Sequence, residues 1–267
     1  MVNFAGKSDK GITRKRNEDA FCLIGGGDGS PLVLAVADGM GGHMAGDVAS
    51  QMAIATIRES IGSAPLDASC TDAVSARLKK IVAAANDRIY KRSVWDPDCA
   101  GMGTTLTVAA CLPGTMVLAH VGDSRAYHFR GGAISKITTD HTYVEELVKI
   151  GSLTREEARV HPKRNYITRA VGSMAGAEPD IYEVGMEPFD RLLLCTDGLS
   201  NMLSDGEIAD AVYASDDPER ICASLIEMSN GKGGFDNITA LAFLNMGAPA
   251  DAGAGAGMAA QERGVAR

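Results

Sequence analysis

Aspartates stand at the ends of four strongly apolar stretches of this 267-residue chain. Three of them follow such a stretch and one precedes it: Asp38, Asp123, Asp197 and Asp236, beside residues 32–37, 117–122, 192–196 and 238–244. A further acidic pair, Glu18 and Asp19, precedes residues 21–24. Strands buried in a core hold their ends rigidly, so each would deliver a carboxylate to a fixed point.

Carboxylates that converge cannot all remain ionised unaided. Two unit charges about 4 Å apart at an effective dielectric constant near 20 repel by roughly 4 kcal/mol, so convergence implies either protonation or bound cations. A site built of oxygen ligands favours hard ions such as Mg²⁺ or Mn²⁺ over zinc. Asp-Gly is also a common turn pair, and each aspartate by itself could be an ordinary turn residue. Spacing alone leaves both interpretations open.

The strands that would position these residues are short and closely spaced. We predict them at residues 21–24, 32–37, 105–111, 116–121, 126–129, 133–137, 181–184, 191–196 and 238–244. Gly131-Gly132 is typical of a hairpin turn between two of them. Because short turns join most neighbouring strands near the middle of the chain, antiparallel pairing is favoured over βαβ crossovers.

Helical patterns lie between the strands. We predict helices at residues 46–61, 72–91, 141–150, 154–159, 205–214 and 218–230. The second carries the stripe of a core-facing helix: Val74, Leu78, Ile81, Val82, Ala85 and Ile89. Thr154 with Glu157, and Ser204 with Glu207, fit capping boxes at helix starts. The predicted class is therefore α+β, an antiparallel sheet with helices packed outside it.

The composition is that of a folded domain. With 45% hydrophobic and 22% charged residues, a wholly disordered or fibrous chain is excluded. The net charge of −8 argues against a nucleic-acid partner, which would favour a basic patch. No run of 18 apolar residues occurs, the N-terminus has no apolar signal segment, and six cysteines are scattered. These features predict a cytoplasmic protein with reduced thiols and no membrane partner.

The C-terminal residues differ in composition from the rest. From Gly247 onward glycine and alanine dominate. Glycine loses much conformational entropy on ordering and alanine buries little surface, so such a segment has little to gain from packing. We expect residues 1–246 to form one domain and residues 247–267 a flexible tail.

Six short motifs follow one another along the chain. They are Asn17-Glu18-Asp19, Ala37-Asp38-Gly39-Met40-Gly41-Gly42-His43, Gly101-Met102-Gly103-Thr104-Thr105, Gly122-Asp123-Ser124-Arg125, Thr196-Asp197-Gly198-Leu199 and Asp236-Asn237-Ile238-Thr239. One such motif is a weak signal, but all six in this order resemble the bacterial branch of the metal-dependent Ser/Thr protein phosphatases of type 2C, over about residues 5–246. The resemblance implies a four-layer αββα sandwich, with two antiparallel sheets flanked by helix pairs and a two-metal centre at one end.

The resemblance also implies roles for individual residues at the metal centre. Asp38 would bridge two metal ions, and the Gly39 carbonyl would bind one of them. Asp197 and Asp236 would bind the second ion. Glu18 would act through a metal-bound water.

Three further positions follow from the same resemblance. Arg14 matches the arginine that binds the substrate phosphate, and its bidentate fork is one that a lysine cannot copy. Asp123, together with Asp197, would hold a third ion. Residues 139–171 correspond to a mobile flap, in which Asn165 would contact that third ion.

The implied activity is hydrolysis of phosphoserine and phosphothreonine in proteins with two Mn²⁺ or Mg²⁺ ions, and a third in bacterial members. Two metals about 3.5–4 Å apart lower the pKa of a bridging water and neutralise the phosphoryl oxygens. The expected partners are phosphorylated proteins, namely a bacterial Ser/Thr kinase and its substrates, and we expect a monomer. The alternative is a catalytically inactive phosphoprotein-binding sensor or scaffold, which loss of the ligand aspartates would favour; all four are present.

Two features have competing interpretations. The glycines that follow Asp38 resemble a nucleotide-binding loop, but the GxGxxG spacing and the Walker lysine are missing. Many eukaryotic members carry a histidine, a candidate general acid, at the place of Met40. Here His43 lies three residues later, which leaves its role as a proton donor open. His120, inside a predicted strand, is interpreted as a core histidine.

Overall fold

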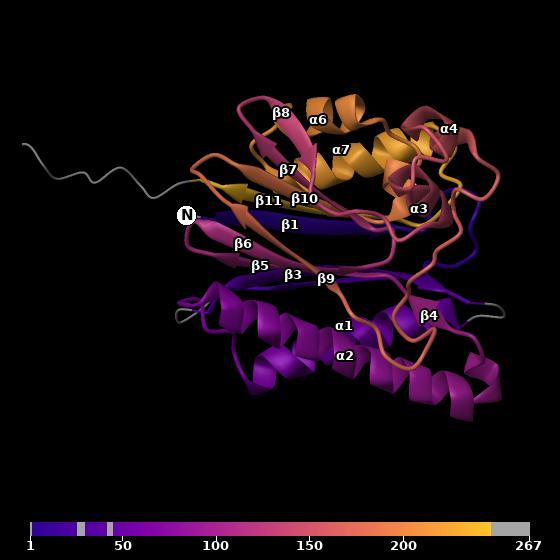
Figure 1. The fold of residues 1–267 in the computed structure, drawn as a ribbon. Coiled ribbons are helices and arrows are strands. Elements are labelled where there is room, and N and C mark those ends of the chain that lie inside the picture. The colour runs from indigo at the N-terminus through magenta and orange to yellow at the C-terminus, as the bar shows by residue number, and fades with distance from the viewer. Residues whose placement is uncertain (1, 26–29, 42–44, 247–267) are drawn as a thin grey trace, which may run out of the picture.

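The computed structural model describes residues 2–25, 30–41 and 45–246. His43 and the expected tail at 247–267 therefore lie outside the described residues. The chain folds into four layers, a helix pair, two sheets and a second helix pair (Figure 1). The αββα sandwich implied by the sequence resemblance is confirmed.

The first sheet has the strand order β2-β3-β5-β6-β9, with the short strand β4 beside β3. Its strands are β2 (Asp19–Ile24), β3 (Leu32–Met40), β4 (Gly103–Thr104), β5 (Leu106–Leu112), β6 (Thr115–Val121) and β9 (Asp180–Gly185). All its strand pairs are antiparallel, as the short turns predict. The outer face is covered by α1 (Gly46–Ser63) and α2 (Thr71–Trp95), and every residue of the predicted stripe on α2 is buried.

The second sheet has the order β1-β11-β10-β7-β8 and is also antiparallel. Its strands are β1 (Val2–Asp9), β11 (Ile238–Asn245), β10 (Arg191–Cys195), β7 (Arg125–Arg130) and β8 (Ala133–Lys136). Helices α6 (Asp205–Tyr213) and α7 (Pro218–Gly231) cover its outer face. A third apolar cluster, which includes Leu34, Leu118, Leu194 and Phe243, fills the space between the two sheets.

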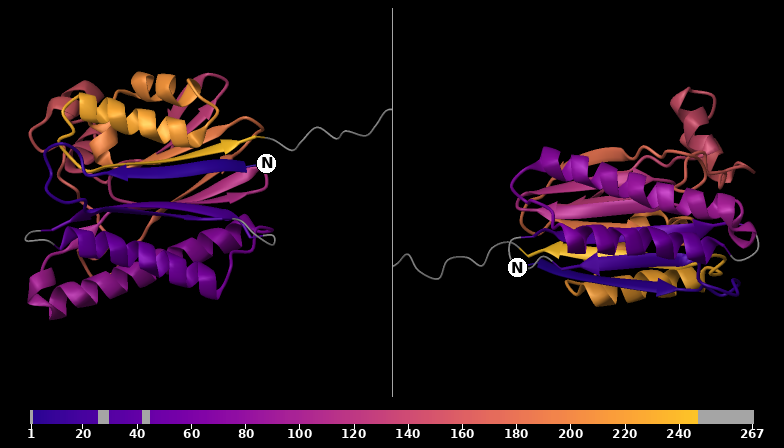
Figure 2. Two further views of the ribbon diagram at one scale, coloured as in Figure 1. Left: turned by 180° about the vertical axis from the view of Figure 1, so that it is seen from behind. Right: turned by 90° about the horizontal axis from the view of Figure 1, so that it is seen from below.

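One end of the sandwich carries the remaining helices. The short helices α3 (Tyr143–Lys149) and α4 (Arg155–Val160) project from this end (Figure 2). A four-residue helix, α5 (Asp197–Ser200), follows β10, and the 3₁₀ helix η1 (Pro97–Cys99) follows α2. Both predicted capping boxes are present, at Thr154 and Ser204. None of the described helices is long and apolar enough to cross a membrane.

The structure corrects the predicted elements at a few points. Strand β1, which the sequence analysis missed, pairs with β11 along its whole length, although Gly6, Lys7 and Ser8 interrupt any apolar alternation. Strand β3 does not end at residue 37 but continues through Asp38 to Met40, because Gly39 and Met40 pair with β4. Asp197 does not occupy a turn: it begins α5, with Thr196 at the N-cap.

Candidate active site

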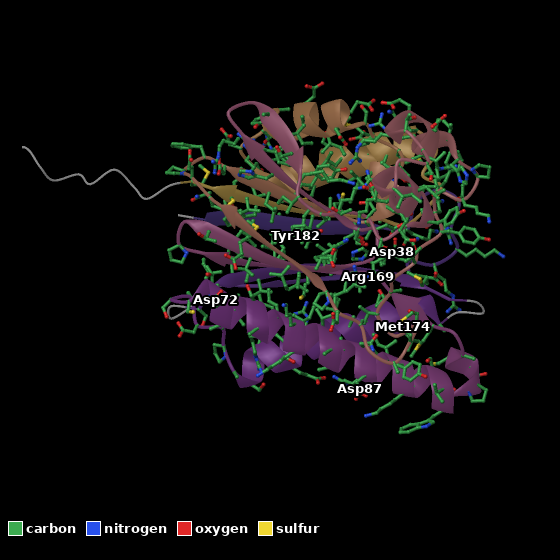
Figure 3. The ribbon with its side chains drawn as sticks, in the orientation of Figure 1. Asp38, Asp72, Asp87, Arg169, Met174 and Tyr182 are labelled. Carbon is green, nitrogen blue, oxygen red and sulfur yellow. The ribbon has the colours of Figure 1, made fainter. Side chains whose placement is uncertain are left out.

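A cavity of about 280 Å³ opens between the sheets and the loops at one end of the sandwich. It is lined by all eight residues that the sequence resemblance selected: Arg14, Glu18, Asp38, Gly39, Asp123, Asn165, Asp197 and Asp236. Met40, Gly41, Ile167 and Asn237 complete the lining. Asp38 lies toward the end that carries α3 and α4, away from the N-terminus (Figure 3). The aspartates that are scattered in sequence are therefore gathered in one place.

Both sheets supply carboxylates to this cavity. Asp38 lies on β3 of the first sheet, whereas Asp197 follows β10 and Asp236 precedes β11 of the second sheet. Asp123 lies on the short connection from β6 to β7, which passes from one sheet to the other. The site thus depends on how the two sheets face each other.

Two threonines fix the backbone of Asp38. Its N–H donates to the Thr105 hydroxyl at 2.9 Å. Its carbonyl accepts from the Thr105 N–H and from the Thr104 hydroxyl, each also at 2.9 Å. The Thr105 hydroxyl in turn contacts that of Ser124 at 2.8 Å, next to Asp123. The Gly-Thr-Thr motif therefore positions the central carboxylate of the cavity.

Gly39 occupies a place that admits no side chain. A Cβ atom there would lie 2.0 Å from the Gly46 carbonyl oxygen and 2.7 Å from the Glu18 carbonyl oxygen. The Gly39 N–H donates to that Glu18 carbonyl at 3.1 Å. The glycine therefore serves close backbone packing around the cavity, which agrees with the interpretation that the glycine-rich segment is not a nucleotide-binding loop.

The cavity carboxyls are strongly perturbed. Burial raises the pKa of Asp38 well above its usual value, and the neighbouring charges of Asp19, Asp197 and Asp123 raise it further. Burial and then the charge of Asp197 raise the pKa of Asp123 well above its usual value. Burial and then Asp236 raise the pKa of Asp197, although a hydrogen bond with Asp38 partly offsets this. Burial and mutual repulsion therefore make it unfavourable for all of these carboxyls to be ionised together unless positive charge is added.

The donor set fits divalent cations. Asp123 Oδ1 and Asp197 Oδ1 are buried and have no hydrogen-bond partner among the described residues, which is costly for a carboxylate oxygen. Over the described ranges, no group of three or more His, Cys, Asp or Glu side chains is arranged so that it could hold a metal ion by itself. Mg²⁺ usually keeps several waters and binds through only one or two carboxylates.

Arg14 contacts the wall of the cavity. Its Nη2 donates to Asp236 Oδ2 at 2.8 Å and its Nε donates to the Phe235 carbonyl at 3.4 Å. The guanidinium group carries five N–H donors in a planar fork, so these contacts leave donors for an anion in the cavity. The Arg14 side chain is 49% exposed, which keeps it accessible to a ligand.

Asn237 is a functional candidate that the sequence analysis quoted in a motif but assigned no role. Its side chain is buried and binds the segment that carries Arg14 and Glu18. Oδ1 accepts from the Glu18 N–H, and Nδ2 donates to the carbonyls of Lys10 and Arg16, each at 2.8 Å. Its position directly after Asp236 was the only sequence signal that pointed to a role for Asn237 at the site.

Asp19 is a second residue without an assigned role. It is buried behind Asp38, its antiparallel partner, and its Oδ2 accepts from Thr239 at 2.6 Å and from Thr196 at 2.9 Å. Burial raises the pKa of Asp19 to about 7. These bonds cross from the first sheet to the second, so Asp19 links the two halves of the site below the cavity.

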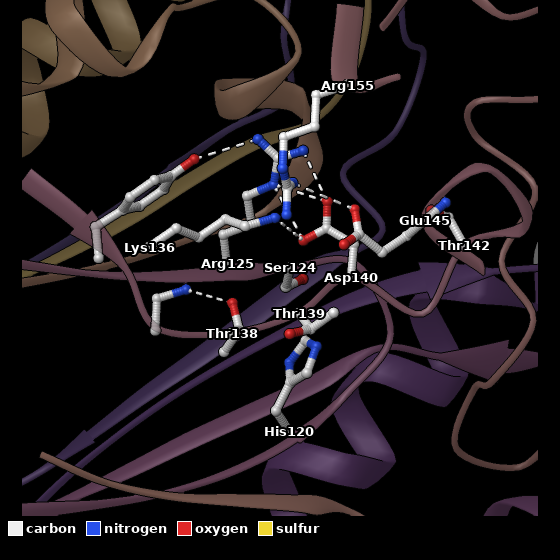
Figure 4. Close-up of polar contacts among 12 residues, drawn as sticks. His120, Ser124, Arg125, Lys136, Thr138, Thr139, Asp140, Thr142, Glu145 and Arg155 are labelled. Carbon is white, nitrogen blue, oxygen red and sulfur yellow. Dashed lines mark hydrogen bonds and ion pairs between the residues drawn. The ribbon is translucent and has the colours of Figure 1, made fainter. Parts of the chain in front are cut away.

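An ion-pair network is centred on Asp140 (Figure 4). Arg125 binds Asp140 through Nε and Nη2, the latter at 2.8 Å, and Lys136 binds the same carboxylate at 3.1 Å. Desolvation works against the charge of Asp140, but Arg125 and Lys136 outweigh it and lower its pKa. The arginine of the Gly-Asp-Ser-Arg motif is therefore paired with Asp140 rather than with a cavity carboxylate.

The predicted core histidine is confirmed in its place. His120 is fully buried on β6, its Nδ1 contacts the Thr107 hydroxyl at 2.9 Å, and burial lowers its pKa to about 3. Its ring lies 4.9 Å from that of His141. His141 Nδ1 accepts from the Gly122 N–H at 3.0 Å, next to Asp123. Neither histidine is among the residues that line the cavity.

The sequence and the fold both resemble bacterial Ser/Thr phosphatases. Residues 12–228 match the family model described as protein phosphatase 2C. The chain is 36% identical over 235 residues to the serine/threonine phosphatase stp of Listeria welshimeri, covering 88% of this chain and 92% of that protein. The Mycobacterium tuberculosis serine/threonine phosphatase PstP/Ppp superposes with a TM-score of 0.81 at 38% identity, over 91% of this chain and 98% of that one. A PstP catalytic domain in complex with two manganese ions gives a TM-score of 0.78 at 36% identity, over 91% and 97% of the two chains.

Proposed function

Since this chain belongs to the protein phosphatase 2C family, we propose that its aspartate-lined cavity is the two-metal active site of the enzyme. The protein is a Ser/Thr protein phosphatase that acts on phosphorylated proteins and requires divalent metal ions. The observation that carries the assignment of the site is the convergence of four aspartates from both sheets, two of them with an unpartnered buried oxygen.

In this proposal Asp38 would be a ligand of both metal ions. Its backbone is held by Thr104 and Thr105, which fixes the point from which its carboxylate extends. The Gly39 carbonyl, Asp197 and Asp236 would supply further ligands to the two ions. Bound divalent ions supply an activated water and neutralise phosphoryl oxygens. Cations also relieve the repulsion that raises the pKa of the cavity carboxyls.

The remaining cavity residues orient the substrate and the water. Arg14 presents its fork to the phosphate while Asp236 and the Phe235 carbonyl hold it in place. Glu18, whose N–H donates to Asn237 Oδ1, would orient water at the metal centre. Asp123 and Asn165, together with Asp197, would hold a third ion. We propose Mn²⁺ or Mg²⁺ as the ions.

The physiological partners in this proposal are a bacterial Ser/Thr kinase and the proteins that it phosphorylates, and the enzyme acts as a monomer. An inactive phosphoprotein-binding scaffold is disfavoured, because the ligand aspartates, Glu18 and Arg14 all line the cavity. Such a scaffold would have no need of this complete set.

Metal depletion tests the proposal. The protein is dialysed against a chelator and Mn²⁺ is then titrated by calorimetry, with turnover of a phosphothreonine peptide measured in parallel. We expect no turnover in the depleted protein and recovery as at least two ions bind. Full turnover after exhaustive metal removal, or binding with no turnover of any phosphorylated substrate, would refute it.

A further inference from the structure

Two exposed apolar side chains stand at the rim of the cavity, outside its lining. Ile12 is 67% exposed and Phe235 is 61% exposed. Phe235 directly precedes Asp236, and Ile12 lies two residues before Arg14, so both are attached to the wall that would bind the phosphate. We call this pair the rim ledge.

Hydrogen bonds join the two loops that carry the rim ledge. The Ile12 N–H donates to the Gly234 carbonyl at 2.8 Å, and the Thr13 hydroxyl donates to the Phe235 carbonyl at 2.9 Å. Arg14 Nε donates to that same Phe235 carbonyl. The ledge and the phosphate-binding arginine therefore belong to one hydrogen-bonded unit and keep a fixed spacing.

The side chains of the rim ledge pack against two glycines. A Cβ atom on Gly233 would lie 2.6 Å from the Phe235 ring, and one on Gly234 would lie 2.8 Å from Ile12 Cγ1. Both glycines have positive φ, at 123° and 50°, which side-chain-bearing residues rarely adopt. The ring and the Ile12 side chain thus rest on glycine backbone and turn their other faces outward.

We propose that the rim ledge binds an apolar side chain of the protein substrate, located within about three residues of the phosphorylated residue. The inference rests on the proposed function, which brings the phosphate to Arg14 and the flanking segment over the rim. An extended chain advances about 3.3–3.6 Å per residue, and neighbouring Cα atoms lie 3.8 Å apart. A position one to three residues from the phosphoresidue therefore reaches the ledge. Exposed aromatic residues on a rigid support are typical anchors at protein interfaces.

Matched peptides and matched variants test this proposal. The reference is a phosphothreonine peptide with serine at the three positions on either side, and the test peptides carry one leucine at each of those six positions in turn. With wild-type enzyme and saturating Mn²⁺, we expect leucine in at least one position to raise kcat/KM about tenfold, equivalent to ~1.4 kcal/mol. Phe235→Ser and Ile12→Ser should remove that gain, chiefly through KM.

Two controls separate substrate binding from damage to the site. Hydrolysis of p-nitrophenyl phosphate, which has no flanking residues, should be unchanged in Ile12→Ser, because Ile12 lies outside the cavity lining and does not contact Arg14 in the proposed site. Phe189→Ser removes a phenyl ring that is more exposed than that of Phe235, at 74%, and the Phe189 N–H donates to the Asn245 carbonyl at the far end of β11. This control should keep the leucine preference.

The possible results are distinct. No leucine preference in the wild type, or one that survives in both ledge variants, overturns the rim ledge. An equal loss on p-nitrophenyl phosphate in Ile12→Ser also overturns it, because Ile12 would then act on the site itself rather than on the flanking residue of the substrate. A wild-type enzyme inert toward both substrates with Mn²⁺ overturns the proposed function and the ledge with it.

Discussion

Replacement of Asn237 by alanine tests how much the positioning of Arg14 and Glu18 contributes to the rate, because it keeps every side chain that we propose as a metal ligand. The Asn237 side chain makes three hydrogen bonds to backbone groups of the segment that carries these two residues. A buried hydrogen bond contributes about 1 kcal/mol net, so we expect Asn237→Ala to lower the free energy of unfolding by about 3 kcal/mol. A displacement of about 1 Å in a reacting group can cost roughly 10²-fold in rate, so we expect kcat/KM to fall by about that factor.

The assay combines urea denaturation with steady-state kinetics at saturating Mn²⁺, well below the melting temperature. Asn86→Ala is the matched control, because the buried Asn86 amide also binds two backbone groups, the Gly172 N–H at 2.7 Å and the Met174 carbonyl at 3.0 Å. It lies on α2 and does not line the cavity. It should lose about 2 kcal/mol of stability and keep wild-type kcat/KM. If Asn237→Ala also kept wild-type kcat/KM, the positioning argument would be wrong and Asn237 would only stabilise the fold.

Four further changes probe the remaining assignments. Asp38→Asn should bind Mn²⁺ weakly by calorimetry and reduce turnover to background. Without metal it should be more stable than the wild type by denaturation, because the raised pKa of Asp38 makes its ionisation destabilise the folded wild type. This difference should grow as the pH rises above the ordinary pKa of an aspartate. Asp123→Ala should keep the fold and two ions but lose turnover, and unaltered Mn²⁺ stoichiometry with unaltered kinetics would remove Asp123 from the site. His43→Ala should keep substantial activity toward a phosphothreonine peptide, because Met40 fills the place of the family's histidine. A fall of roughly 10²–10⁴-fold in rate, with metal binding intact, would show that His43 acts as a general acid. Deletion of residues 248–267 should leave the melting temperature and p-nitrophenyl phosphate turnover nearly unchanged, and a large drop in melting temperature would show that this segment packs on the domain.

Most elements of the fold could be predicted because their sequence patterns are local. The stripe on α2 and the capping boxes at Thr154 and Ser204 follow from spacing alone and are present. Strand β1 was missed because its partner, β11, lies more than 200 residues away, and its own residues show no apolar alternation. The extension of β3 past Asp38 was missed for the same reason, since it depends on pairing with β4.

The site was predicted in a different way. Apolar strands ending in aspartate suggested carboxylates at fixed points, but only the resemblance to a known family indicated that they converge. The place of Asn237 directly after Asp236 pointed to the site, but its three contacts could not be predicted, because the partners belong to a segment that begins at Lys10, far away in sequence. The raised pKa of Asp19 likewise depends on burial that only the packed sandwich creates.

Because both sheets supply carboxylates to the cavity, the apolar core between the sheets affects the geometry of the cavity as well as the stability of the fold. Asp38 moves with the first sheet, while Asp197 and Asp236 move with the second. Packed sheets lie about 10 Å apart, at a distance set by the side chains that interdigitate between them. The volumes of Leu34, Leu118, Leu194 and Phe243 therefore influence the separation of the cavity carboxylates. A change of a single methylene group in this core would therefore alter the spacing of the cavity carboxylates as well as the stability of the fold.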